Sequence, residues 1–197
     1  ECILFPGFFD PQVNGFGGVD FNDRNLDPER FEKAARSLAS FGVTHFFPTL
    51  ITASHERVLH QLKRISQALE GNALSRWMCP GIHLEGPYLN SEDGPRGAHP
   101  KAFIRNPQWD EILSYQEACS GRIRLITLAP ETEGALPFIE KAVSEGIVIG
   151  IGHTNASEEV LEDAVRAGAR LSTHLGNGAH AILPRHRNPI QKQLSLE

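Results

Sequence analysis

The sequence lacks the features that mark membrane, nucleic-acid-binding and disulfide-stabilised proteins. No apolar run reaches the ~18 residues that cross a bilayer, and no basic stretch followed by an apolar segment indicates a targeting peptide. The net charge is −5 and there is no basic block, which argues against a nucleic-acid partner. The three cysteines, Cys2, Cys79 and Cys119, are far apart and form no C-x-x-C motif. They predict reduced thiols and a cytoplasmic protein.

Nucleotide-binding motifs are also missing, because neither G-x-G-x-x-G nor G-x-x-x-x-G-K-[ST] begins a helix. What the sequence has is a regular alternation of apolar runs and amphipathic segments. We predict strands at 2–9, 42–47, 81–85, 122–128, 146–152 and 170–175, helices at 27–40, 54–70, 109–119, 134–145 and 157–167, and a polar loop at 86–107. Continuous apolar strands are typical of parallel sheets covered on both faces. The fold class is therefore α/β, either an open doubly wound sheet or a (β/α)8 barrel.

Polar side chains stand at the predicted carboxyl ends of these strands, where the chemistry of a barrel collects. They are Asp10, Gln12 and Asn14, then His45 and Thr49, His83 and Glu85, His153 and Asn155, and His174 and Asn177. A barrel would bring Glu85, His153 and His174 together. One carboxylate, two imidazoles and a water are a common ligand set for a catalytic divalent metal. Each of the three alone is more often a solvated or hydrogen-bonded side chain, so the spacing leaves both interpretations open.

Several segments occur in an order that resembles a known family. They are PGFFDPQVNGFGGVDF, GVTHFFPTLIT, GIHLEGPYLN, GAHP, ITLAPE, IGHTNAS and STHLGNG. Together they resemble the N-acetylglucosamine-6-phosphate deacetylases of the amidohydrolase superfamily, over nearly the whole chain. The combination of HLEGP, GHT and THL is the most specific part. The resemblance implies a (β/α)8 TIM barrel of the metal-dependent amidohydrolase type, here partial, with about six strands.

The resemblance implies that Glu85, His153 and His174 are metal ligands. It implies one divalent ion, zinc in the first place, with iron, cobalt or manganese as alternatives. Many amidohydrolases carry H-x-H on the first strand and bind a second metal there. This chain has Gln12 and Asn14 in those places. Because amide side chains are poor ligands beside imidazole, we expect a single metal and place both residues among those that bind substrate.

The remaining implied roles concern the substrate. His99 is the expected catalytic residue that polarises the acetamide carbonyl, and Ala98, Asn177 and Gly178 match stretches that line the substrate. Arg187 matches an arginine that holds the sugar phosphate, a task that suits the fixed fork of a guanidinium. The implied reaction is metal-assisted removal of the acetyl group from N-acetylglucosamine 6-phosphate, in amino-sugar catabolism. The expected partner is this small molecule, with no nucleic acid and no membrane, and members of the family commonly form homodimers.

Two departures from the family pattern keep other functions open. The last barrel strands, with an aspartate on the eighth, and a small flanking β-sandwich domain have no counterpart in the sequence. Residues 1–197 are therefore expected to be a partial catalytic barrel that is inactive alone. After His174 the chain reads LGNG, where the family has Tyr or Phe and then Asn-Ala-Met. A second hypothesis is therefore an amidohydrolase acting on a different N-acyl or cyclic amide, and a third is a non-catalytic metal-binding remnant or packing fragment.

Overall fold

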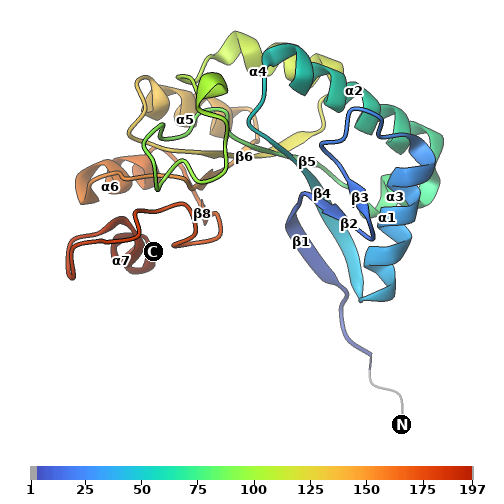
Figure 1. Cartoon of the computed structure of the whole chain (residues 1–197), viewed down its shortest axis with the longest axis horizontal. Helices are drawn as coiled ribbons and strands as arrows, with labels where there is room; N and C mark the ends of the chain where they lie inside the picture. Colours follow the sequence, from blue (N-terminus) through green and yellow to red (C-terminus); the bar gives the residue numbers. More distant parts are fainter. Residues whose placement is uncertain (1–3, 197) are drawn as a thin grey trace. The chain divides into compact units, whose positions relative to one another are not determined.

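The computed structural model describes residues 4–196, which form an α/β structure (Figure 1). Six strands form one sheet in the order β1-β4-β5-β6-β7-β8. They are β1 (Phe8–Val13), β4 (Val43–Ile51), β5 (Ile82–Glu85), β6 (Ile123–Leu128), β7 (Val148–Ile151) and β8 (Leu171–Ser172). The pairs β1–β4, β6–β7 and β7–β8 run parallel. The predicted α/β fold with six parallel strands is confirmed.

The chain divides into two compact units. Within the described residues, the first comprises 4–50, 55–83 and 114–123, and the second comprises 51–54, 84–113 and 124–196. The first unit contains α1 (Pro28–Ser40), α2 (His55–Gly71), α3 (Ala73–Met78) and a hairpin of β2 (Gly15–Phe16) and β3 (Val19–Asp20). The second contains α5 (Ala135–Ser144), α6 (Glu158–Arg166) and α7 (Pro189–Ser195). The bounds of α4 (Trp109–Ala118) include residues of both.

The first unit is held by helix capping and an aromatic core. Asp27 accepts a hydrogen bond of 2.8 Å from the backbone N–H of Arg30, the N-cap contact that begins α1. The rings of Phe21, Phe31 and Phe46 are fully buried, with centroids 5.0 to 6.0 Å apart. Figure 1 shows α1, α2 and α3 lying side by side in this unit.

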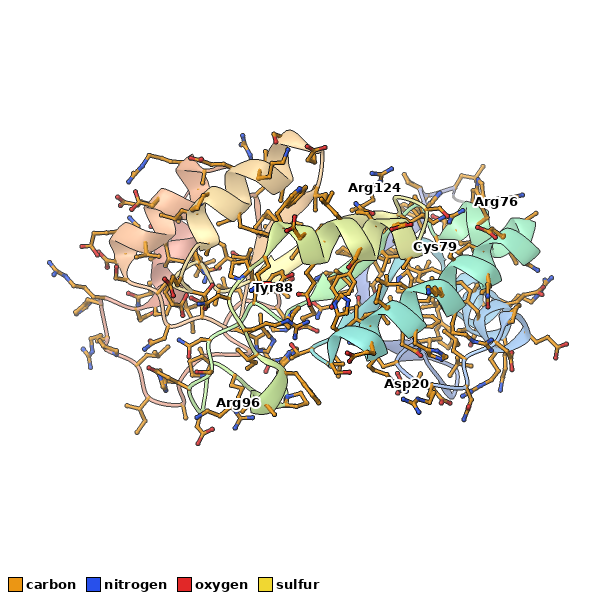
Figure 2. The ribbon with its side chains drawn as sticks, turned by 90° about the horizontal axis from the view of Figure 1, so that it is seen from above. Asp20, Arg76, Cys79, Tyr88, Arg96 and Arg124 are labelled. Atoms are coloured by element: carbon orange, nitrogen blue, oxygen red, sulfur yellow. The ribbon has the colours of Figure 1, made fainter. Side chains whose placement is uncertain are left out.

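In the second unit, the long loop after β5 is attached to α4 by a half-buried polar group. Glu111 accepts a hydrogen bond of 2.7 Å from the Tyr88 hydroxyl and forms an ion pair of 2.6 Å with Arg105. Tyr88 is fully buried, and Figure 2 shows it surrounded by other side chains. Arg105 also bonds the carbonyl of Pro87 through its backbone N–H, at 3.2 Å. Both ends of the loop are therefore fixed.

Several predicted boundaries were wrong. Strand 2–9 begins only at Phe8 and continues through Pro11 to Val13. Residues 2 and 3, with Cys2, lie outside the described residues. Pro11 is tolerated because β1 is at the edge of the sheet, where a missing N–H breaks no ladder. The predicted strand 170–175 is reduced to Leu171–Ser172, because the backbone turns at His174 with φ 29°.

Short elements were not predicted. They are the β2–β3 hairpin, α3, α7 and the 3-10 turn η1 (Lys101–Phe103) within the loop at 86–107. Each is too short for hydrophobic periodicity to identify it. Among residues 4–196, none of the helices combines the length and the apolar composition of a membrane span.

Candidate metal centre

Glu85 lies at the centre of a histidine cluster in the second unit. Its Oε1 atom is 2.7 Å from His174 Nε2, 3.1 Å from His153 Nε2 and 3.9 Å from His99 Nε2. Glu85 is the last residue of β5, His153 follows β7, His174 follows β8, and His99 lies on the loop after β5. The structure thus brings together the three side chains that the sequence singles out as ligands, and adds His99.

Three of these residues are spaced as ligands of one ion would be. Glu85, His99 and His153 offer ligand atoms that all lie within 4.8 Å of one another, and all three side chains are buried. His99 Nε2 is 3.2 Å from His153 Nε2. Two nitrogen or oxygen ligands on a tetrahedral zinc are about 3.3 Å apart, given bonds of ~2.0–2.1 Å. This group contains His99, whereas the group predicted from the sequence contains His174.

The hydrogen bonds of His153 leave a lone pair directed at the carboxylate. Its Nδ1 atom lies 2.8 Å from the carbonyl oxygen of Pro95, which only accepts, so Nδ1 carries the proton. In a neutral ring Nε2 then has a lone pair, and it faces Glu85 Oε1. Two lone pairs 3.1 Å apart repel each other unless a proton or a metal cation lies between them. A ring anchored to a carbonyl through its other nitrogen is also the usual arrangement of metal-bound histidine, so the site fits a divalent cation.

Thr52 controls which nitrogen of His99 carries the proton. His99 Nδ1 lies 2.9 Å from the Thr52 hydroxyl, which is 3.4 Å from the carbonyl oxygen of Glu85. The hydroxyl has one proton to donate. When it donates to His99, Nε2 is an N–H donor facing the cluster. When it donates to Glu85, Nε2 has a lone pair. The first arrangement suits the predicted catalytic role, and the second suits a ligand.

The charges of the cluster follow from burial and contact. Burial alone would raise the pKa of Glu85, but the hydrogen bond from His174, and one from His153 when that ring carries both protons, hold that pKa well below its usual range. Burial, with the neighbouring His153, lowers the pKa of His99 to about 4. The hydrogen bond to Glu85 raises the pKa of His174. At neutral pH Glu85 is therefore ionised and His99 neutral, as metal ligation requires of carboxylate and imidazole.

The backbone is strained at two of the histidines. His153 and His174 have φ angles of 53° and 29°, in the left-handed region that costs a non-glycine residue about 1–2 kcal/mol. Such strain concentrates at functional sites. A Cβ added at Gly178 would lie 2.7 Å from His153 Nδ1, and one at Gly97 would lie 3.3 Å from the same ring. A side chain at either glycine position would therefore crowd the His153 ring.

The other predicted residues of the second unit lie around this cluster. Ala98 is exposed beside His99, and Asn177 is exposed, with its backbone N–H donating to the carbonyl of His174 at 2.8 Å. Gly178, His153 and His174 border a hollow of ≈ 10 Å³, about the space of one water.

Arg187 and the first-strand residues are placed elsewhere. Arg187 is exposed and lines a hollow of ≈ 260 Å³ together with Glu158 and Glu159, two carboxylates that disfavour an anion there. Gln12 and Asn14 belong to the first unit. The backbone N–H of Gln12 donates to the Asp10 carboxylate at 3.0 Å, and Asn14 is exposed.

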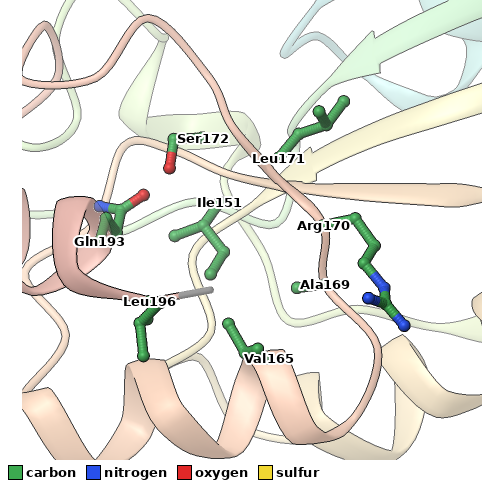
Figure 3. A pocket seen from close by; sticks show the side chains of 8 residues that line it. All are labelled: Ile151, Val165, Ala169, Arg170, Leu171, Ser172, Gln193 and Leu196. Carbon is green, nitrogen blue, oxygen red and sulfur yellow. The ribbon is translucent and has the colours of Figure 1, made fainter.

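A further hollow of ≈ 220 Å³ lies beside β8 (Figure 3). It is lined by Ile151, Val165, Ala169, Arg170, Leu171, Ser172, Gln193 and Leu196. Its lining residues, all from the part of the chain that the structure describes, include no carboxylate, no imidazole and no predicted site residue. In this chain, the candidate metal centre therefore does not lie at a large hollow.

Sequence reasoning missed Thr52 and the Pro95 carbonyl as partners of the histidines. Thr52 directly follows β4, so its place as a polar residue at a strand end was a usable signal. Pro95 acts through a backbone oxygen that any residue supplies, so its identity carried no signal.

No protein-family model matches the chain, but relatives are found. Over 197 residues it is 36% identical to the N-acetylglucosamine-6-phosphate deacetylase of Caenorhabditis elegans, an alignment that covers 95% of this chain and 45% of that protein. It is 38% identical to the N-acetylgalactosamine-6-phosphate deacetylase of Shewanella sp. (strain ANA-3), over 98% of this chain and 47% of that protein.

A solved structure agrees with these relatives. A mutant N-acetyl-D-glucosamine-6-phosphate deacetylase from Mycobacterium smegmatis, in complex with N-acetyl-D-glucosamine-6-phosphate, matches with a TM-score of 0.83 and 33% identity. The match covers 95% of this chain and 47% of that one. In sequence and in fold the chain is thus similar to N-acetylglucosamine-6-phosphate deacetylases, and it spans about half the length of the curated relatives it matches.

Proposed function

We propose that the chain provides the metal-holding part of an enzyme that removes the acetyl group from N-acetylglucosamine 6-phosphate. The products are glucosamine 6-phosphate and acetate. The observation that carries the proposal is the convergence of three histidines on the buried Glu85, in a chain whose relatives carry this activity in their names. In this proposal residues 1–197 are part of a catalytic barrel, the enzyme is a homodimer, and it works in the cytoplasm, where Cys79 and Cys119 stay free thiols.

In this proposal Glu85, His153 and His174 hold one divalent ion, with zinc first and iron, cobalt or manganese as alternatives. Such an ion, when bound, acidifies a water molecule and polarises a carbonyl. Support comes from the ionised state of Glu85, whose pKa is held low, and from the His153 lone pair that faces it.

The other side chains bind and orient the sugar. His99, with its pKa lowered to about 4, is a neutral N–H donor to the acetamide oxygen when Thr52 donates to its Nδ1 atom. A neutral donor stabilises charge that develops on that oxygen during attack. The proposed substrate-binding residues are Gln12, Asn14, Ala98, Asn177 and Gly178. Arg187 is proposed for the phosphate on the family resemblance alone, because Glu158 and Glu159 line the same hollow and disfavour an anion there.

A second candidate substrate is N-acetylgalactosamine 6-phosphate. Two observations keep it open: the 38% identity to a deacetylase named for this sugar and the LGNG sequence after His174, which departs from the pattern of the resembled family. The two sugars differ in the configuration of one hydroxyl, and a single well-placed hydrogen-bonding group can distinguish them.

The test measures acetate release by the full-length gene product from both sugar phosphates, with zinc and with a chelator. We expect release from N-acetylglucosamine 6-phosphate that the chelator and Glu85→Gln both abolish. Faster acetate release from N-acetylgalactosamine 6-phosphate would favour the second candidate. A metal-loaded protein that releases acetate from neither sugar would contradict both and leave the non-catalytic hypothesis.

A further inference from the structure

Glu131 connects two segments beside the metal centre. It follows β6, and its Oε1 atom accepts hydrogen bonds from the Asn90 side-chain amide at 2.8 Å and from the backbone N–H of Asn155 at 2.7 Å. Its Oε2 atom accepts from the Thr154 hydroxyl at 2.5 Å. Both oxygens of one carboxylate are thus occupied, and they link the loop after β5 to the turn after β7.

The turn after β7 is the segment that carries His153. Thr154 and Asn155 follow it directly, and the Thr154 hydroxyl also accepts from the backbone N–H of Ala156 at 3.0 Å. The backbone N–H of Asn90 donates to the His153 carbonyl at 3.1 Å. Because His153 is in the left-handed region, its conformation persists only where the surrounding contacts hold it.

We propose that Glu131 is a positioning residue that fixes the turn after β7 and thereby directs the His153 ring at Glu85. The proposal rests on the proposed metal centre and adds a residue to it. All three groups that contact the Glu131 carboxylate are hydrogen-bond donors. A carboxylate side chain supplies the acceptor oxygens that these donors need. Among the described residues, Glu131 makes its hydrogen bonds to Asn90, Thr154 and Asn155, and it acts on the cluster through the backbone of 153–155.

The test compares Glu131→Ala and Glu131→Gln with a control, Glu133→Ala. Glutamine retains an acceptor oxygen for Asn90 and Asn155. Glu133 lies in the same loop, is exposed, and accepts from the Asn106 amide at 3.2 Å. The first measurement is the NMR signal of the His153 Nδ1–H proton in the metal-free protein, which reports its hydrogen bond to the Pro95 carbonyl. The second is zinc affinity, by competition with a chelator.

We expect Glu131→Ala to shift or broaden the His153 signal and to weaken zinc binding by about 10-fold, the lower end of the range for groups outside the ligand shell. Glu133→Ala should stay close to the unsubstituted protein, and Glu131→Gln, which loses only the acceptor for the Thr154 hydroxyl, should have a small effect between the two. An unchanged His153 signal in folded Glu131→Ala would overturn the proposal, as would equal losses in the control.

The two proposals fail in different ways. If the unsubstituted protein binds no zinc, the proposed function fails, and the NMR comparison still decides the role of Glu131. If Glu131→Ala does not fold, Thr154→Val removes one of the three hydrogen bonds and gives the same two readouts. We then expect a smaller shift of the His153 signal, and an unchanged signal would reject the positioning role.

Discussion

At the scale of single residues, the positions of protons decide what the cluster can hold. The Pro95 carbonyl fixes the proton of His153 on Nδ1, whereas the Thr52 hydroxyl leaves two choices for His99. A neutral His153 ring therefore presents a lone pair to Glu85, whereas a neutral His99 ring has two possible tautomers. This difference suits His153 to the proposed role of metal ligand and His99 to the proposed role of a residue that acts on the substrate.

His174→Ala and His99→Ala should therefore behave differently. We expect His174→Ala to weaken zinc binding by more than about 100-fold, because even groups outside the ligand shell are worth about 10–100-fold. His99→Ala should keep the metal and lose acetate release. Metal analysis after dialysis, paired with the acetate assay, measures both. Loss of metal in His99→Ala with retention in His174→Ala would show that the ligands are Glu85, His99 and His153.

Gly178→Ala should disturb the His153 ring. An added Cβ would meet His153 Nδ1 at 2.7 Å, and the φ of 108° is already unsuited to alanine. We expect weaker zinc binding together with loss of the hydrogen bond from His153 Nδ1 to the Pro95 carbonyl. Gly146→Ala is the matched control, because it shares a positive φ of 77° but meets nothing within 4 Å. Equal effects of the two substitutions on zinc affinity would mean that strain, and not contact with the ring, is responsible.

At the scale of elements, the site depends on loops that are tied at both ends. His99 lies between Tyr88 and Arg105, and both of these contact Glu111 on α4. The loop is long, yet this polar group keeps its two ends in place. The cluster therefore depends on a contact that is remote from the chemistry.

Glu111→Ala should loosen this loop. The buried Tyr88 hydroxyl and the Arg105 guanidinium both lose the carboxylate, and we expect a cost of about 2–3 kcal/mol in the free energy of unfolding. Urea unfolding followed by circular dichroism measures it. Asp110→Ala, an exposed neighbour in the first turn of the same helix, should cost less than about 0.5 kcal/mol. A similar small cost for Glu111→Ala would contradict the proposed anchoring.

Much of the fold was predictable because the long elements carry their own signals. The Asp27–Pro28 pair marks the start of α1, and Ser157 marks that of α6. The left-handed backbone at His174, which ends β8, left no mark in the sequence because histidine rarely adopts it. Predicting the convergence of Glu85, His153 and His174 needed only the strand ends. Adding His99 needed the path of a loop, which periodicity does not describe.

At the scale of the whole molecule, the chain covers about half the length of its curated relatives, and its described residues form two compact units. The cluster lies entirely within one of them. The other contains two cysteines, Cys79 and Cys119, which are buried and free. They report on the integrity of that unit.

Neither thiol should react in the folded protein. Burial raises the pKa of Cys79 to about 12 and also raises the pKa of Cys119, so the reactive thiolate is scarce at pH 8. In a Cys2→Ser background, we expect no iodoacetamide labelling without denaturant and labelling of both thiols in urea, measured by mass spectrometry. Rapid labelling of the folded protein would show that the first unit opens readily.

The most direct measurement is anomalous diffraction at the zinc edge from crystals of the zinc-loaded protein. We expect one peak within ~2.0–2.2 Å of a Glu85 oxygen, His153 Nε2 and His174 Nε2, with His99 outside the ligand shell. A peak elsewhere in the molecule, or none after loading, would contradict the claim that these side chains share an ion.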